Sequence, residues 1–175
     1  MFLFTVPDSG KPDLEQLMEE YGTELLRLCY LYFKDYQLAE DAVQETFIKV
    51  FTKFHTFKGD SSMKTWITRI AINVCKDFIR KRSYRELPRD FDLYTAADQD
   101  APEPESATID TDENIALLNA VCALSDIYRE TVLLYYYSGF NTREIAKILH
   151  IGETTVCVRL KRARDLLRGE LSVED

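Results

Sequence analysis

Two consecutive helical patterns of apolar residues, between Ala39 and Arg82, are the feature that most constrains how this chain can fold. Apolar side chains recur there at spacings of three and four, the period of an α-helix that buries one face. In the first pattern the apolar stripe consists of Ala39, Val43, Phe47, Val50, Phe51 and Phe54. In the second, which begins near Ser62, it consists of Met63, Trp66, Ile67, Ile70, Ala71, Val74 and Phe78. We therefore expect two helices, joined by a short loop, that share one core.

Each of these helices also carries a polar face beside its apolar stripe. With about 100° between successive residues, the first helix turns an acidic-polar set away from the core. This set consists of Asp41, Gln44, Glu45 and Ile48. The basic-polar set on a flank of the second helix consists of Thr65, Arg69, Asn73, Lys76 and Arg80. The pattern indicates two binding surfaces on a common core, and the alternative is that the acidic face is an ordinary solvated surface.

The composition favours an all-α chain that forms one ordinary domain or two small ones. The 175 residues are 46% hydrophobic and 30% charged, with six glycines and five prolines. No window alternates polar and apolar residues between turn signals, as a half-buried strand would. The net charge of −8 argues against a surface that wraps nucleic acid on all sides. Because the charge is segregated along the chain, a local basic surface remains compatible with it.

Residues that carry enzyme or metal chemistry are sparse in this sequence. The cysteines stand far apart and form no CxxC pair: Cys29, Cys75, Cys122 and Cys157. Only His55 and His150 could complete a zinc site, so we expect reduced, mostly packed thiols and neither a metal nor a cofactor. Without a phosphate-binding loop or a nucleophile beside a base, no catalysis is expected. Residues 1–14 have neither a basic start nor a long apolar run, which predicts a cytoplasmic protein without membrane insertion.

Charge and proline divide the chain into two helical parts. A helix is expected over Leu14–Leu31, with a break at Lys34–Gln37 before the two patterns described above. Residues 90–113 contain nine acidic residues, no basic one and two prolines, which indicates a flexible acidic linker. The linker is a solvated spacer, or its charge screens a basic surface when no nucleic acid is bound. The expected organisation is an N-terminal extension at 1–13, a helical domain at 14–89, the linker at 90–111 and a second helical domain at 112–175.

The segment from Asn141 to Arg168 predicts a helix-turn-helix. Asn141 and Glu144 have the spacing of a capping box, which opens a short helix at Thr142–Leu149. A turn at 150–152 separates it from a longer helix at Glu153–Arg168, an arrangement typical of DNA-reading motifs. The inward residues of the longer helix are Val156, Leu160, Ala163 and Leu167. Its outward residues are Thr154, Val158, Lys161, Arg162 and Arg168, with Thr155 and Arg159 at the edge.

Together the two stretches resemble the extracytoplasmic-function (ECF) class of bacterial sigma factors, the minimal two-domain members of the sigma-70 family. In the first half the resemblance is carried by Ala39–Phe47, Phe57, Trp66–Asn73, Asp77 and Arg80–Arg82. In the second half it is carried by Thr142–Ala146 and Val156–Arg164. It extends over Leu14–Leu171. The departures from the usual pattern, which has proline, glycine and serine there, are Gly152, Thr154 and Val158.

The resemblance implies an RNA polymerase sigma factor that directs core polymerase to specific promoters and initiates transcription. The first domain would be sigma region 2, a helical bundle, and the second sigma region 4, with the helix-turn-helix. The residues implied in docking on the clamp helices of the largest polymerase subunits are Asp41, Gln44, Glu45 and Ile48. Those implied in holding and melting the promoter −10 element are Phe57, Ser61, Ser62, Arg69, Asn73, Lys76 and Arg80. Those implied in binding the −35 duplex are Thr154, Thr155, Val158, Arg159, Lys161 and Arg162.

The same resemblance implies further partners, and two other functions stay open. The second domain would also meet the polymerase flap, and a dedicated anti-sigma factor, often anchored in the membrane, would restrain the protein. A two-domain helix-turn-helix regulator acting without polymerase would account for residues 141–168 but not for the acidic face. The second alternative is an adaptor that contacts only proteins. Trp66 resembles a stacking platform for a base, but its place in the apolar stripe favours core packing.

Overall fold

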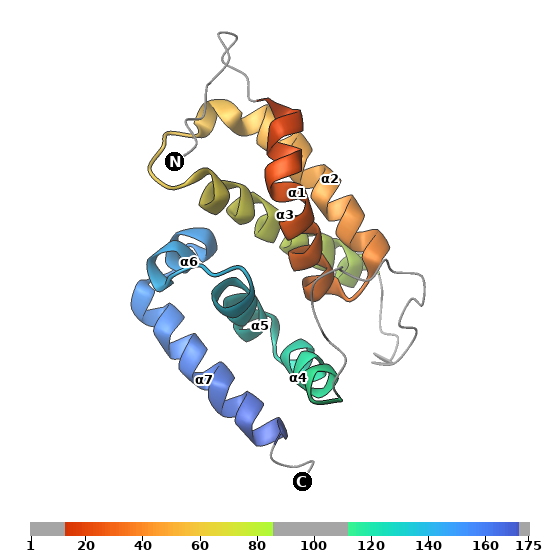
Figure 1. Ribbon diagram of the computed structural model, residues 1–175, viewed down its shortest axis with the longest axis vertical. Coiled ribbons are helices and arrows are strands. Elements are labelled where there is room, and N and C mark those ends of the chain that lie inside the picture. Colours follow the sequence, from red (N-terminus) through yellow and green to blue (C-terminus); the bar gives the residue numbers. More distant parts are fainter. Residues whose placement is uncertain (1–12, 86–111, 172–175) are drawn as a thin grey trace. The chain divides into compact units, whose positions relative to one another are not determined.

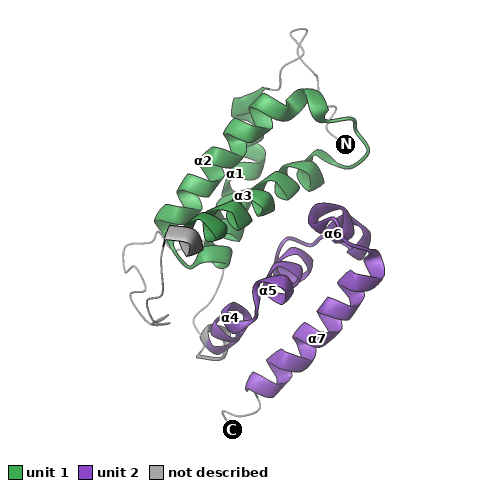
Figure 2. Cartoon of the chain, turned by 180° about the vertical axis from the view of Figure 1, so that it is seen from behind, with its two compact units in different colours: residues 1–93 green, residues 94–175 purple. Residues whose placement is uncertain are grey.

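The computed structural model of the protein describes residues 13–85 and 112–171. Within these two ranges every regular element is a helix (Figure 1), so the predicted all-α class is confirmed. The chain divides into two compact units, residues 1–93 and 94–175 (Figure 2). The predicted linker at 90–111 and all but the last residue of the predicted N-terminal extension lie outside the described residues.

In unit 1, side-chain caps start the first two helices. The described helices are α1 (Leu14–Phe33), α2 (Tyr36–Lys53), the 3-10 turn η1 (Phe54–Thr56) and α3 (Met63–Arg85). Asp13 caps α1 by accepting a hydrogen bond from the N–H of Gln16 at 3.2 Å, and Asp35 caps α2 in the same way. Lys34 ends α1 in the left-handed conformation, with φ 56°. The predicted break is therefore confirmed at Lys34 and Asp35, whereas Tyr36 and Gln37 of the predicted range already belong to α2.

The core of unit 1 forms where α1, α2 and α3 contact one another. Its buried residues are Leu17, Leu25, Phe47, Val50, Trp66, Ile67 and Ala71. The ring centroid of Trp66 lies 5.4 Å from that of Phe57 and 6.3 Å from that of Phe54. The aromatic residues after α2 thus fold back over the start of α3, and Trp66 is a core residue, as its place in the stripe predicts.

The buried face of α2 is rotated relative to the predicted stripe. Ala42 and Thr46 are buried although the pattern did not mark them, and Phe51 is 42% exposed although it did. Thr46 tolerates burial because its hydroxyl donates to the carbonyl oxygen of Ala42 at 2.7 Å. With these two small side chains facing the core, the helical period carries Phe51 round to the solvent side. The prediction that Phe51 belongs to the core is wrong.

Helix α3 buries a wider arc than one stripe. Ile72 and Cys75 are buried in addition to the predicted positions. Thr65, predicted on the basic flank, is buried: its N–H donates to Ser62 Oγ at 3.1 Å, and its hydroxyl oxygen lies 2.8 Å from the same atom. Thr65 therefore belongs to the N-terminal cap of α3, and its assignment to the basic flank is corrected.

In unit 2, a long last helix packs along three shorter ones. The described elements are α4 (Asp112–Ala123), α5 (Asp126–Val132), the π-helical turn η2 (Leu133–Tyr137), α6 (Thr142–Leu149) and α7 (Glu153–Leu171). Helix α7 contacts α4, α5 and α6 (Figure 1). Its predicted inward residues Val156, Leu160 and Ala163 are buried, and Leu167 is half-buried.

Local chemistry fixes the turns on either side of α6. The predicted capping box is present: Asn141 Oδ1 accepts from the N–H of Glu144, and Glu144 Oε2 accepts from the N–H of Asn141, both at 3.0 Å. Gly139 precedes it with φ 72°, a backbone conformation that favours glycine. His150 ends α6 in the left-handed region, with φ 54°. The helix-turn-helix is thus formed with the predicted bounds for its first helix.

Candidate protein and nucleic-acid interfaces

Helix α2 presents a polar face to solvent with two apolar side chains at one end. Asp41 and Gln44 are exposed, and the side chain of Glu45 is 40% exposed. Ile48 is 58% exposed and Phe51, one helical turn further on, is 42% exposed. The structure thus brings all four predicted residues onto one surface and adds Phe51, which the periodicity argument had missed. We call these five residues the docking face.

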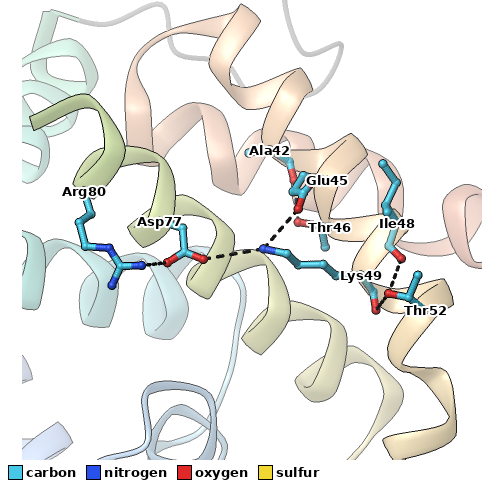
Figure 3. A network of polar contacts seen from close by, with 8 residues as sticks. All are labelled: Ala42, Glu45, Thr46, Ile48, Lys49, Thr52, Asp77 and Arg80. Carbon is cyan, nitrogen blue, oxygen red and sulfur yellow. Dashed lines mark hydrogen bonds and ion pairs between the residues drawn. The ribbon is translucent and has the colours of Figure 1, made fainter. Parts of the chain in front are cut away.

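An ion-pair chain joins the docking face of α2 to helix α3 (Figure 3). Lys49 Nζ lies 3.4 Å from Glu45 Oε1 and 3.8 Å from Asp77 Oδ2, so it bridges the two helices. Asp77 Oδ1 in turn accepts a hydrogen bond from Arg80 Nη2 at 2.7 Å. Because these groups are partly exposed, each pair contributes little to stability, about 0.2–1 kcal/mol. Their alternating signs nevertheless place a carboxylate beside the exposed Arg80 guanidinium.

The basic flank of α3 is formed by four residues at spacings of three and four, which lie along one side of the helix. These are Arg69, Asn73, Lys76 and Arg80. Asn73 and Arg80 are exposed, whereas Arg69 and Lys76 are half-buried. The side chains combine positive charge with one amide, which has both a donor and an acceptor. This surface can attract phosphate and pair with the edge of an unpaired base.

Residues of the loop before α3 pack against that helix and cap it. Phe57 is half-buried against Trp66, and Ser62 caps α3 through its bonds to Thr65. Ser61 is half-buried, and Gly59 takes a positive φ of 77° at the turn. The structure therefore places the predicted loop residues next to the start of the basic-flank helix.

The outward surface of α7 matches the prediction at every position except Arg159, and Arg168 near its end is exposed as predicted. Thr154, Thr155, Val158, Lys161 and Arg162 are all exposed, and we call them the reading face. The start of α7 is tied to the start of α6, because Glu153 accepts a hydrogen bond from the Thr142 hydroxyl at 2.6 Å and also lies 3.6 Å from Arg143 Nε. The two helices of the motif are thereby held in a fixed relation at the turn.

Arg159 behaves differently from the rest of the predicted set. Its side chain is only 19% exposed, and its Nη1 lies 3.2 Å from Oε1 of Glu130, whose side chain is 4% exposed. Sequence reasoning missed Glu130 because a single glutamate within a short helix gives no signal of its partner 29 residues away. The ion pair joins α5 to α7 behind the reading face.

The cysteines are packed in unit 1 and more open in unit 2. Cys29 of α1 and Cys75 of α3 are buried free thiols whose sulfur atoms lie 3.6 Å apart. Their hydrogen bond, followed by burial, raises the pKa of the Cys75 thiol well above its ordinary value. Cys122 is half-buried and Cys157 is exposed on α7. Packing is therefore confirmed for the first pair but not for Cys157.

The described residues offer neither a metal-binding cluster nor a membrane-spanning helix. Among residues 13–85 and 112–171, no group of three or more His, Cys, Asp or Glu side chains is placed to hold a metal ion. No helix in the same ranges is both long enough and apolar enough to cross a membrane.

Comparison with protein families gives two matches, one in each unit. Residues 17–85 match the model of Sigma-70 region 2, and residues 114–167 match that of Sigma-70, region 4. The first match contains the docking face and the basic flank, and the second contains the reading face. The two candidate surfaces on unit 1 thus lie in one family segment and the helix-turn-helix in the other.

Curated relatives extend this similarity over nearly the whole chain. The ECF RNA polymerase sigma factor SigM of Bacillus subtilis is 30% identical over 156 residues, covering 89% of this chain and 93% of the relative. SigW of the same species is 29% identical over 162 residues, with 89% and 87% covered. The RNA polymerase sigma-H factor of Pseudomonas aeruginosa is 30% identical over 172 residues, with 93% and 88% covered.

Solved structures share the fold. The sigma factor RpoE of Bartonella quintana, crystallised with the anti-sigma factor NepR, superposes with a TM-score of 0.70 at 25% identity, covering 93% of this chain and 99% of that one. CnrH, solved with the cytosolic domain of CnrY, gives a TM-score of 0.67 at 22% identity over 93% of this chain and 89% of that one, a likeness of fold.

Proposed function

This chain belongs to the sigma-70 family and is an RNA polymerase sigma factor of the ECF class, and from that premise we propose which partner each of its two units contacts. As a sigma factor it directs core polymerase to specific promoters and initiates transcription. Unit 1 docks on the polymerase and holds the −10 element, and unit 2 holds the −35 element. The polymerase carries out the bond chemistry, so the sigma factor itself is no enzyme, and both act in the cytoplasm.

The observation that carries this proposal is the docking face of α2. Its carboxylates suit a basic partner helix, and charge complementarity of this kind guides partners into register. Ile48 and Phe51 supply exposed apolar area, and the carboxylates beside them can form the polar rim that surrounds the apolar centre of a protein interface. We assign this face to the clamp helices of the largest polymerase subunits. An ordinary solvated helix face has no need of two large apolar side chains one turn apart.

The basic flank of α3 serves the −10 element. Arg69, Lys76 and Arg80 attract the phosphates of the strand, and Asn73 pairs with a base edge once the strands have parted. Separating and flipping a base costs about a few kcal/mol, so a pocket that holds the extruded base favours melting. We assign the extruded base to the loop Phe57–Ser62, which the Ser62 cap supports by fixing the start of α3.

The reading face of α7 serves the −35 element as duplex DNA. Early residues of such a helix reach base edges in the major groove, and later basic ones contact phosphate. Thr154, Thr155 and Val158 therefore select the sequence, while Lys161 and Arg162 add affinity. Unit 2 also contacts the polymerase flap. Two weak contacts on one chain act as a stronger one when the spacing of the promoter elements fits.

An anti-sigma factor is part of this proposal. One relative of the same fold, the sigma factor RpoE, has been crystallised with the anti-sigma factor NepR, and we extend that relationship to this chain. The partner is either soluble or anchored in the membrane. By covering the docking face or the DNA-binding surfaces it would keep the sigma factor from the polymerase until it is needed.

Transcription in vitro over a library of promoters tests the function. Core polymerase supplied with this chain is expected to start RNA at templates that share two spaced elements, whereas core polymerase alone does not select them. A helix-turn-helix regulator that works without polymerase docking would bind DNA yet start no RNA. Absence of starts at every template would contradict the proposal, and so would starts that share no upstream elements.

A further inference from the structure

We propose that Arg159 is a positioning residue of the reading helix and not a contact to DNA. Its ion pair with the buried Glu130 sets the rotation at which α7 presents Thr155 and Val158 to the −35 element. This inference rests on the proposed function of unit 2. It adds that Glu130, which lies away from the DNA-binding surface, influences which −35 sequence that surface binds.

Burial separates Arg159 from the other basic residues of α7. Lys161 and Arg162 are exposed, whereas the Arg159 side chain is 19% exposed and directed to Glu130 on α5, with Nη1 and Oε1 3.2 Å apart. The carboxylate itself is almost fully removed from water. A buried carboxylate is tolerated only when it is paired and hydrogen-bonded, so the guanidinium is held back from a phosphate in the groove.

The ion pair supplies a restraint that the apolar core cannot. Val156, Leu160 and Ala163 bury α7 against its neighbours, but apolar contact is not directional and allows a helix to rotate or slide. A charge-assisted hydrogen bond is directional and short-ranged. Arg159 follows Val158 directly and lies one turn after Thr155, so a rotation at this anchor moves both side chains across the base edges.

Salt dependence separates positioning from phosphate contact. The full-length protein, assembled with core polymerase, is titrated onto promoter DNA at several salt concentrations and onto promoters with single −35 substitutions. The variants are Arg159→Gln, Glu130→Gln, the double variant and Lys161→Gln as the phosphate-contact control. Loss of one phosphate contact reduces the slope of log affinity against log salt by about 1 and weakens all sequences alike.

We expect Lys161→Gln to reduce the slope in this way, and Arg159→Gln to leave the slope unchanged while altering the ranking of −35 substitutions. Glu130→Gln should alter the ranking in the same manner. The double variant removes both charges. It should bind promoter DNA at least about threefold more tightly than Arg159→Gln does, because the effects of coupled residues are not additive. Where Arg159→Gln fails to fold, Arg159→Lys keeps the charge and is expected to shift the ranking.

Three results would overturn the inference. One is a slope reduced by Arg159→Gln as much as by Lys161→Gln, and another is a double variant no better than Arg159→Gln. The third is an unchanged −35 ranking in Glu130→Gln. A wild-type complex that is indifferent to the −35 sequence would instead contradict the proposed function of unit 2 itself.

Discussion

Phe47 and Phe51 stand one turn apart on α2 and have opposite environments. Phe47 is 4% exposed in the core of unit 1, and Phe51 is 42% exposed on the docking face. The two residues are chemically identical, so a comparison of their truncations isolates what the environment contributes. The fold uses the first for packing and leaves the second partly exposed on the same surface as Ile48.

Phe51→Ala is expected to weaken core polymerase binding while leaving the fold intact. Truncation of an aromatic residue at an interface centre costs about 1–4 kcal/mol of binding free energy. The matched variant Phe47→Ala removes a core side chain and should lower the free energy of unfolding by about 3–5 kcal/mol. Chemical denaturation and a polymerase-binding titration measure the two quantities. Equal polymerase affinity of Phe51→Ala and wild type would remove Phe51 from the docking face.

Asp77→Asn is expected to strengthen binding to −10 DNA. The substitution removes a negative charge that pairs with Arg80 and Lys49 beside the basic flank. Because the pairs are exposed, the free energy of unfolding should change by less than about 1 kcal/mol. The gain in affinity of the polymerase complex for forked −10 DNA should shrink as salt is raised. A gain that is the same at low and high salt would show that this charge does not act on the DNA.

The buried thiol pair predicts a pH dependence of stability. The pKa of Cys75 is raised in the folded protein, so its contribution to stability is fully present below the ordinary thiol pKa of about 8.5 and falls as the pH rises above it. The stability advantage of wild type over Cys75→Ala should therefore shrink between about pH 8 and pH 10. The exposed Cys157 provides the control, because Cys157→Ala removes a thiol that is not buried in a core. A constant advantage of wild type over Cys75→Ala would contradict this.

At the scale of elements, the structure shows which features local sequence can determine. The first helix of the motif begins where the capping box predicts, because Asn141 and Glu144 interact with backbone only three residues away. The break at Lys34 has the same local origin. The environments of Phe51 and Arg159 depend instead on how far each helix is rotated against its neighbours. Residues distant in sequence decide that rotation, and no short pattern records it.

A single substitution at Asn141 measures how much the capping box of α6 contributes to the stability of unit 2. Asn141→Ala removes the acceptor for the N–H of Glu144 and is expected to cost about 0.5–2 kcal/mol of unfolding free energy. Asn141→Asp keeps a capping oxygen and should retain most of that stability. Thermal unfolding of the full chain measures both, and −35 binding should weaken in Asn141→Ala alone. If the two variants unfold at the same temperature, the side-chain cap contributes nothing.

At the scale of the whole molecule, the surfaces proposed for polymerase docking and for −10 DNA lie on different helices of one small unit. The docking face lies on α2 and the basic flank on α3, and Lys49 links the two helices through Glu45 and Asp77 (Figure 3). Both surfaces were predictable from helical periodicity and charge alone, with Phe51 and Thr65 as the exceptions. The assignment of each surface to its partner required the family relationship, because periodicity cannot identify what a polar face binds.

The affinity of the Glu45→Arg variant for core polymerase tests the central claim most directly. Reversing this charge should weaken the complex at least about tenfold, because it places a cation against a basic partner surface. Glu19→Arg reverses an exposed glutamate of α1 outside the docking face and should stay within about twofold of wild type, since isolated surface charges contribute little. Equal affinities of Glu45→Arg and Glu19→Arg would contradict the account.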